Sequence, residues 1–274
     1  MPPPRRPGRP AAARGEAGAT RLGDDGWDAY AAFYDWENAR TIKRRDVGFW
    51  RGLAAAAEGR ILELGTGTGR VAVPLARDGI ALTGVDRSPA MLARARRRVS
   101  RFGLQRRLAL LLGDMRALPF RRGSFNLIMA PYGVLQSLTQ ERDLRAALAS
   151  VHRVLRPGGR FVIDLVPDLV EWSEYDRRKT LSGRMAPATT VTLIESVRQD
   201  ARRGLTIFDQ RYTTVRAGRR EVRDFSLTFR TVSIPGMRER LERQGFAIDA
   251  VLGDYQGAPL DLRADVWIIL ARRR

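Results

Sequence analysis

Residues 61–70 constrain the fold of this chain more than any other segment, because they join an apolar run to alternating glycines. The run at 61–64 predicts a buried strand, and Gly65, Gly67 and Gly69 follow where a helix begins. Glycine has no Cβ, so a ligand can lie almost against the main chain of such a turn. The first amides of the following helix supply oriented donors. The segment therefore predicts a cofactor site at the end of a strand.

Two cofactor classes fit these glycines, and Glu63 favours one of them. Residues 67–72 also match the G-x-G-x-x-A fingerprint of dinucleotide binding. A pyrophosphate would face the Glu63 carboxylate there, whereas S-adenosylmethionine carries a sulfonium and an ammonium and no phosphate. The residues therefore favour S-adenosylmethionine, and NAD stays open as the alternative.

The composition limits the chemistry that is available to the chain. Its 274 residues include no cysteine and one histidine, which excludes disulfides, cysteine nucleophiles and thiolate or histidine-cluster metal sites, so we expect no metal. No apolar run approaches the roughly 20 residues that cross a bilayer, and the N-terminus lacks the apolar stretch of a secretory signal. We expect a cytoplasmic protein that does not bind membranes.

The net charge of +19 raises the possibility of an anionic partner such as nucleic acid. All basic residues except Lys43 and Lys179 are arginines, and they are scattered along a chain that is also rich in alanine, glycine and proline. This pattern is typical of a coding bias towards arginine. Nucleic acid binding is therefore possible but not favoured.

The order of predicted elements indicates an α/β fold. Residues 1–26 are rich in proline, arginine, glycine and alanine, so we expect a disordered tail, followed by one domain over 27–274 that opens with helices at 27–36 and 44–57. Five strands, at 60–64, 81–85, 108–112, 125–129 and 160–165, alternate with helical stretches that include 90–99 and 141–155. This alternation predicts a doubly wound parallel sheet.

The periodicity changes beyond Asp164. Two-residue alternations at 191–193, 205–212 and 225–229, with breaks at 203–204 and 217–218, predict a small antiparallel β lid inserted at about 168–234. A helix at 237–244 and strands at 246–252 and 266–271 then complete the main sheet. The expected fold is a doubly wound, seven-stranded Rossmann-like sheet with this insertion.

Four motifs occur in an order that resembles the class I S-adenosylmethionine-dependent methyltransferases. They are the glycine loop at 63–69, the strand end at 84–88, Gly113-Asp114-Met115, and the segment at 155–161. The resemblance covers about residues 30–272 and implies a Rossmann-like methyltransferase fold with S-adenosylmethionine as cofactor. It implies that Asp86 accepts hydrogen bonds from the ribose hydroxyls and that Asp114 lies near the adenine amino group. The expected cofactor contacts are Glu63, Gly65, Thr66, Gly67, Gly69, Asp86, Arg87, Asp114, Met115 and Ala130.

The acceptor side carries less specific residues. Many enzymes that methylate the exocyclic amine of adenine or a glutamine amide resemble one another in an Asp-Pro-Pro-Tyr or Asn-Pro-Pro-Tyr tetrad after the fourth strand. Here Ala130-Pro131-Tyr132 stands at that place instead, which argues against those acceptors. His152 lies in a helix of the outer layer, so we expect no histidine base. Direct in-line displacement needs mainly positioning, for which the candidates are Tyr34, Tyr132 and Gln136. The candidates for substrate binding are Tyr212, Arg230 and Tyr255.

We therefore expect a methyltransferase that acts on a small molecule, most plausibly at an amine nitrogen and next at oxygen. The layout is similar to that of the glycine/sarcosine and sugar-amine N-methyltransferases. Two alternatives stay open: an RNA or protein methyltransferase, and a cofactor-binding protein without transferase activity. Either a monomer or a homodimer is compatible with the sequence.

Overall fold

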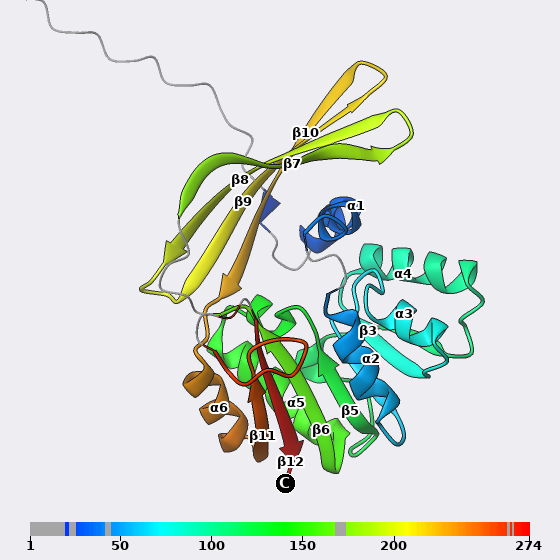
Figure 1. Ribbon diagram of the computed structural model, residues 1–274, viewed down its shortest axis with the longest axis vertical. Coiled ribbons are helices and arrows are strands. Elements are labelled where there is room, and N and C mark those ends of the chain that lie inside the picture. The colour runs from blue at the N-terminus through cyan, green and yellow to red at the C-terminus, as the bar shows by residue number, and fades with distance from the viewer. Residues whose placement is uncertain (1–19, 22–25, 42–44, 168–173, 262–263, 265) are drawn as a thin grey trace, which may run out of the picture.

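Two β-sheets, one above the other with a helix between them, make up the protein in the computed structural model (Figure 1). The structure describes residues 20–21, 26–41, 45–167, 174–261, 264 and 266–274. None of the helices in this part of the chain is long and apolar enough to cross a membrane.

The lower, central sheet has seven strands in the order β11-β12-β6-β5-β2-β3-β4. All neighbours from β6 to β4 pair in parallel, while β12 is antiparallel to both β6 and β11. The predicted seven-stranded, Rossmann-like sheet is confirmed. Its strands are β2 (Ile61–Leu64), β3 (Leu82–Asp86), β4 (Leu108–Leu112), β5 (Phe125–Ala130), β6 (Leu155–Leu165), β11 (Phe246–Leu252) and β12 (Trp267–Arg273).

Helices cover both faces of the central sheet. Successive side chains of a strand point to opposite faces, so Leu62 and Ile128 pack with α5 (Glu141–Val154) and α6 (Ile234–Arg243). Ile61 and Leu127 pack on the other side with α2 (Val47–Ala55), α3 (Ala72–Arg77) and α4 (Pro89–Arg101). Two short 3₁₀ helices, η1 (Met115–Ala117) and η2 (Val134–Ser137), follow strands β4 and β5. Both sheet faces are thereby buried, which explains the near-continuous apolar runs of these strands.

Local signals set the ends of two of these elements. The Ser88 hydroxyl accepts a hydrogen bond from the Met91 amide at 3.1 Å, so Ser88 caps α4 one residue before Pro89. Helix α5 ends at Val154, but β6 begins at Leu155 and not at Arg160 as expected. The pairing of β6 with β5 shifts register across this segment, where Gly158 has a φ of +72°. An irregular start therefore extends the strand backwards to the helix.

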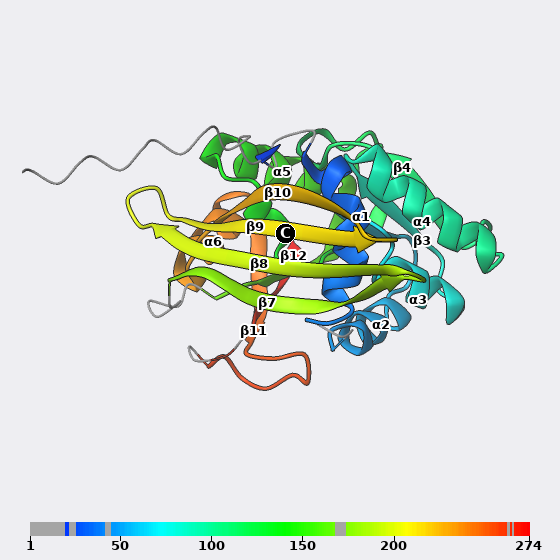
Figure 2. The same cartoon turned by 90° about the horizontal axis from the view of Figure 1, so that it is seen from above.

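The upper sheet is larger than the small lid that we expected. Four strands of 12 residues each, β7 (Tyr175–Ala186), β8 (Thr189–Asp200), β9 (Leu205–Arg216) and β10 (Arg219–Arg230), run antiparallel and cross over the central sheet (Figure 2). The sequence pattern missed β7, because most of its side chains are exposed at the sheet edge and show no apolar alternation. The first residues of the expected insertion, 168–173, lie outside the described residues.

A fifth, short strand joins the upper sheet from the N-terminal segment. Residues Thr20–Arg21 form β1 and pair in parallel with Phe225 and Ser226 of β10. Strand β1 falls within residues 1–26, for which we expected no regular structure. The rest of that segment, apart from Gly26, lies outside the described residues.

Helix α1 (Gly26–Asn38) lies between the two sheets and packs against the upper one. Its buried Tyr30 and Phe33 contact Phe225, and the Phe33 ring stacks on Tyr212 at 4.3 Å between centroids. The opposite side of α1 faces α4, where Asp28 accepts hydrogen bonds from the Ser88 hydroxyl and the Ala90 amide. This helix therefore connects the upper sheet to the central one.

Candidate active site

A cavity of about 730 Å³ lies between the carboxyl ends of the central strands, helix α1 and the upper sheet. We call the part contributed by the central sheet the lower wall; it includes Gly65, Gly67, Asp86, Arg87, Asp114 and Met115. The part contributed by α1 and the upper sheet is the upper wall; it includes Trp27, Tyr30, Glu37, Glu195, Phe208, Gln210 and Phe229. Ligands bind at this end of the strands in open α/β sheets.

The glycine loop shapes the lower wall by close approach. All three glycines have positive φ, +59° at Gly65, +55° at Gly67 and +78° at Gly69. A Cβ on Gly65 would come within 2.2 Å of Val134 Cγ2, so this glycine is packed against η2. A Cβ on Gly67 would meet nothing closer than 3.8 Å, and Gly67 lines the cavity. A side chain there would occupy the space that a ligand needs.

Two carboxylates end the neighbouring strands in the same wall. Asp86 accepts hydrogen bonds from the Gly67 amide at 2.7 Å and from the Ser88 amide at 2.8 Å, and burial raises its pKa. Asp114 caps η1 and pairs with Arg116 at 2.6 Å. Burial opposes its ionisation, but the hydrogen bonds from Arg116 outweigh burial and hold the pKa of Asp114 below its ordinary value.

Glu63 lies beneath the loop and does not line the cavity wall. It is 3% exposed, and its Oε2 atom has no hydrogen-bond partner among the described residues. Burial raises the pKa of Glu63 to about 8, although the nearby Arg70 opposes this shift. A buried acceptor without a donor destabilises the protein, and such groups occur where a ligand supplies the missing charge or hydrogen bond.

The lower wall fits a nucleoside with a cationic, phosphate-free chain. Glu63, Asp86 and Asp114 place three carboxyl groups around the glycine loop. Of the three, the Asp86 carboxylate lines the wall beside the Gly67 amide, where it would repel a pyrophosphate and attract a sulfonium or an ammonium. Among the described residues, no group of three or more His, Asp or Glu side chains could hold a metal ion.

Besides Glu63, three more expected cofactor contacts lie behind the wall. Thr66 is 3% exposed, Gly69 packs towards Val73 of α3, and Ala130 is fully buried in the sheet. Pro131, the next residue, lines the cavity instead of Ala130. The alternation of side chains across strand β5 explains this difference, since Ala130 points into the core between β5 and α5.

The three candidate positioning residues, Tyr34, Tyr132 and Gln136, all line the cavity. Tyr132 follows β5 with a φ of +63°, which is unusual for a residue with a side chain, and Arg70 lies over its ring at 4.9 Å. Gln136 is almost fully bonded: its amide donates to the carbonyls of Val166 and Arg230 at 3.1 Å, and its Oε1 accepts from the Val166 amide. Gln136 therefore connects the central sheet to β10.

The three candidate substrate residues occupy different places. Arg230 lines the cavity, and its guanidinium pairs with Glu141 at 2.7 Å. Tyr212 is fully buried behind the upper wall and donates its hydroxyl to Glu37. It therefore supports a wall residue and does not face the cavity.

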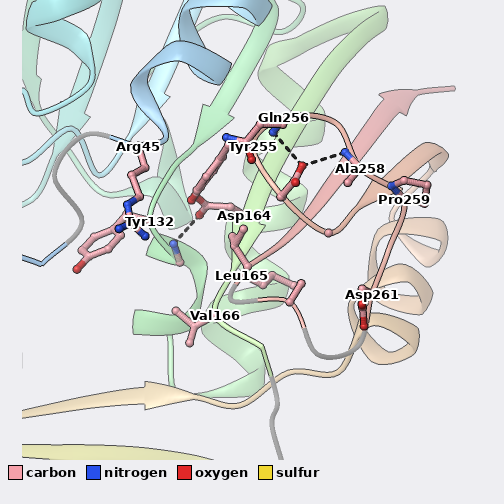
Figure 3. Close-up of a pocket in the computed structure, with 15 residues that line it drawn as sticks. Arg45, Tyr132, Asp164, Leu165, Val166, Tyr255, Gln256, Ala258, Pro259 and Asp261 are labelled. Carbon is pink, nitrogen blue, oxygen red and sulfur yellow. Dashed lines mark hydrogen bonds between the residues drawn. The ribbon is translucent and has the colours of Figure 1, made fainter.

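Tyr255 lines a second cavity of about 570 Å³, beside the first (Figure 3). Its hydroxyl donates to Asp164 Oδ2 at 2.7 Å, and the Gly133 amide donates to Asp164 Oδ1. The two cavities share Tyr132, Gly133 and Val166, so they meet at the ends of β5 and β6. His152 lines neither cavity. It lies on α5 in the outer layer, where its ring packs edge-on against Phe246 of β11.

The sequence pattern missed the polar part of the upper wall. Glu37 lies on the same face of α1 as Tyr30 and Tyr34, and Gln210 of β9 is paired with Glu195 of β8. Gln210 Nε2 donates to Glu195 Oε2 at 2.7 Å and to Glu37 Oε1 at 3.3 Å. The available sequence signal for Glu37 was its position seven residues after Tyr30, on the same aromatic face of the helix. Nothing local in the sequence points to its two partners.

Comparison with known proteins finds a family match for the central part of the chain. Residues 61–159 match the family model described as a methyltransferase domain. A demethylmenaquinone methyltransferase of Thermus thermophilus is 41% identical over 106 residues, which are 38% of this chain and 46% of that protein. A phosphatidylethanolamine N-methyltransferase of Cereibacter sphaeroides is 39% identical over 108 residues, 39% of this chain and 51% of that protein. The chain thus spans about half the length of these curated relatives.

Solved structures are similar to nearly the whole chain. A methyltransferase from Streptomyces caelestis has a TM-score of 0.75 at 20% identity and covers 92% of this chain and 99% of its own. A sugar N-methyltransferase from a Streptoalloteichus species has a TM-score of 0.73 at 18% identity, with 97% and 100% covered. These likenesses confirm the fold, including the upper sheet, to which the family match does not extend.

Proposed function

We propose that this chain, which carries a class I S-adenosylmethionine-dependent methyltransferase domain, transfers a methyl group to an amine nitrogen of a small molecule. S-adenosylmethionine supplies that methyl group on its sulfonium. In this proposal the lower wall holds the cofactor, with Asp86 at the ribose and Asp114 near the adenine. The upper wall then faces the acceptor.

The observation that carries the amine assignment is the pair of carboxylates in the upper wall. Glu37 and Glu195 both line the cavity, and neither forms an ion pair with any Lys or Arg that the structure describes. Most of the other carboxylates that the structure describes have an arginine partner close by, as Asp46, Asp114 and Glu141 do. A protonated amine would supply the missing positive charge.

Aromatic rings around the acids favour the same class of ligand. Trp27, Tyr30, Phe208 and Phe229 line the upper wall. The faces of such rings attract organic cations by about 0.5–2 kcal/mol each. A polyanion such as RNA would meet acidic and apolar surface here, which supports a small molecule over a nucleic acid.

The names of similar proteins support nitrogen without deciding it. A sugar N-methyltransferase and a phosphatidylethanolamine N-methyltransferase are similar to this chain, but so is a demethylmenaquinone methyltransferase. These names do not agree on one kind of acceptor, and the amine is our inference from the upper wall. For the reaction itself, Tyr34 and Tyr132 would position the acceptor for in-line displacement, since oriented reactants gain roughly 7–11 kcal/mol.

A screen with labelled S-adenosylmethionine tests the proposal. Matched primary amines, secondary amines, alcohols and carboxylic acids would be incubated with the full chain, and products identified by mass spectrometry. We expect label in N-methylated products alone, with the Asp86→Ala variant as the control that lacks cofactor binding. Label found only in O- or C-methylated products would contradict the amine assignment. Thermal stabilisation by NAD but not by S-adenosylhomocysteine would contradict the cofactor.

A further inference from the structure

The two upper-wall carboxylates are held differently, although one glutamine joins them. Glu195 Oε1 accepts from the Tyr175 hydroxyl, and its Oε2 accepts from Gln210 at 2.7 Å. In Glu37 a single atom, Oε2, accepts the hydroxyls of both Tyr30 and Tyr212. Among the residues that the structure describes, its other atom, Oε1, has only the longer 3.3 Å contact with Gln210. Glu37 Oε1 is therefore the least occupied carboxylate oxygen of the pair.

Glu37 also lies on the helix that reaches the glycine loop. Tyr34, one turn before it, lines the cavity, and Asp35 accepts a hydrogen bond from the Thr68 hydroxyl of the loop at 2.6 Å. Glu195 belongs to strand β8 of the upper sheet, on the far side of Gln210. Of the two acids, Glu37 thus belongs to the element that contacts the loop.

From this arrangement we propose that Glu37 is the catalytic base, which takes a proton from the acceptor ammonium through Oε1, while Glu195 holds the cation in place. The inference rests on the proposed amine methylation. One N–H bond of the ammonium breaks, and the proton goes to Glu37 Oε1. The freed nitrogen lone pair forms the bond to the methyl carbon, and the C–S bond breaks with its electrons going to sulfur. The product is a methylated ammonium with a neutral thioether, and the proton on Glu37 passes to water.

The surroundings of Glu37 suit this role. Burial raises its pKa, as does the neighbouring carboxylate of Glu195, while the hydroxyls of Tyr212 and Tyr30 and the amide of Gln210 oppose the shift. A carboxyl with a raised pKa accepts a proton closer to neutral pH than an exposed one. Tyr132, across the cavity, and Tyr175 of β7 are two further titratable groups whose charges are coupled to Glu37. The two tyrosine hydroxyls still bond Oε2 when Oε1 is protonated, so the side chain need not move.

Matched variants separate the two acids. With an amine that the screen identifies, we expect Glu37→Gln to lower kcat about 100-fold with KM nearly unchanged and to abolish the acidic limb of the pH–rate profile. Glu37→Asp should keep that limb with partial activity. Glu195→Gln should raise KM about tenfold and keep kcat, and it should keep the acidic limb but move it to lower pH, because the carboxylate that raises the pKa of Glu37 is lost. If Glu37→Gln keeps the kcat and the pH profile of the unmodified protein, Glu37 is not the base, although amine methylation itself stands.

A measurement without turnover tests the cation site by itself. The Glu37 carboxyl would be followed by carbon-13 NMR against pH in the full chain with S-adenosylhomocysteine, before and after addition of tetramethylammonium chloride. We expect the pKa of the Glu37 carboxyl to be raised and to fall when the cation is added. It should also fall in the Glu195→Gln variant. An ordinary pKa that tetramethylammonium does not move would overturn the proposal. If the pKa responds as expected but no amine is methylated, the proposed function fails and the base role fails with it.

Discussion

The Asp35 carboxylate on helix α1 accepts a hydrogen bond from the Thr68 hydroxyl at 2.6 Å, and this bond joins the first helix directly to the glycine loop. Arg98 of α4 completes the contact, since it pairs with Asp35 at 2.9 Å and donates to the Thr68 carbonyl at 3.0 Å. Because α1 also carries Tyr34 and Glu37, one helix connects the loop to the upper wall. The positions of Tyr34 and Glu37 therefore depend on the conformation of the glycine loop.

Replacing Thr68 by valine tests this connection. The change keeps the shape of the fully buried side chain but removes the hydroxyl, and we expect it to cost about 1 kcal/mol. Amide hydrogen exchange should become faster across α1 and stay unchanged in α5, which lies against the other side of the sheet. Thr68→Ser, which keeps the hydroxyl, is the control. Equal exchange in both variants would mean that the Asp35 contact does not hold α1.

Gly65→Ala should weaken cofactor binding. The residue has a φ of +59°, which costs an L-residue about 1–2 kcal/mol, and its Cβ would lie 2.2 Å from Val134 Cγ2. The loop must shift to relieve that overlap, so we expect the Kd for S-adenosylhomocysteine to rise at least tenfold by calorimetry. Gly48→Ala, in helix α2 with nothing within 4 Å of its Cβ, should bind normally. Normal binding by Gly65→Ala would show that this close packing is dispensable.

The stability of the protein should depend on pH through Glu63. Its pKa is raised to about 8 from an ordinary value of 4.5, so between these values the folded protein binds more protons than the unfolded chain. The contribution of Glu63 to the free energy of unfolding is therefore fully present below about pH 4.5, and it declines as pH rises towards 8. Glu63→Gln stays neutral, so its advantage over the unmodified protein should grow by up to about 1.4 kcal/mol per pH unit across this window.

Urea unfolding of both proteins at intervals from pH 5.5 to 8.5 measures that advantage. It should approach a few kcal/mol at the alkaline end of the range. A constant difference across the range would refute the raised pKa.

Tyr255 should matter for stability more than for acceptor binding. Its hydroxyl is one of the donors to Asp164, which is 2% exposed, and burial raises the pKa of that carboxyl while Tyr255 opposes the shift. Tyr255→Phe leaves a buried oxygen without its donor and should cost about 1–3 kcal/mol in urea unfolding at pH 7. Tyr132→Phe, at a residue that is 40% exposed, should change stability by less than about 0.5 kcal/mol. An unchanged stability of Tyr255→Phe together with a higher acceptor KM would instead assign Tyr255 to substrate binding.

The parts of the site that depend on local sequence were predictable. The glycine loop, Asp86 and Asp114 each stand where an apolar run ends, and parallel strands bring those ends together at one edge of the sheet. Helix α4 was equally clear, because Ser88 and Pro89 give it a cap and a first turn. Whether a predicted residue faces the cavity or the core was harder to predict, as Ala130 and Tyr212 illustrate.

The sequence by itself determined the doubly wound sheet and the lower wall of the cavity, because strand and helix periods and turn residues are local properties of the chain. Only the tertiary structure decided the upper wall. Glu37 and Gln210 are separated by 173 residues, and their contact exists because β8 and β9 pair in one particular register above α1. A shift of one residue in that register would turn Glu195 or Gln210 to the other face of the sheet. Such a long-range register is set by the packing of the whole upper sheet on Tyr30 and Phe33, which no short segment of sequence encodes.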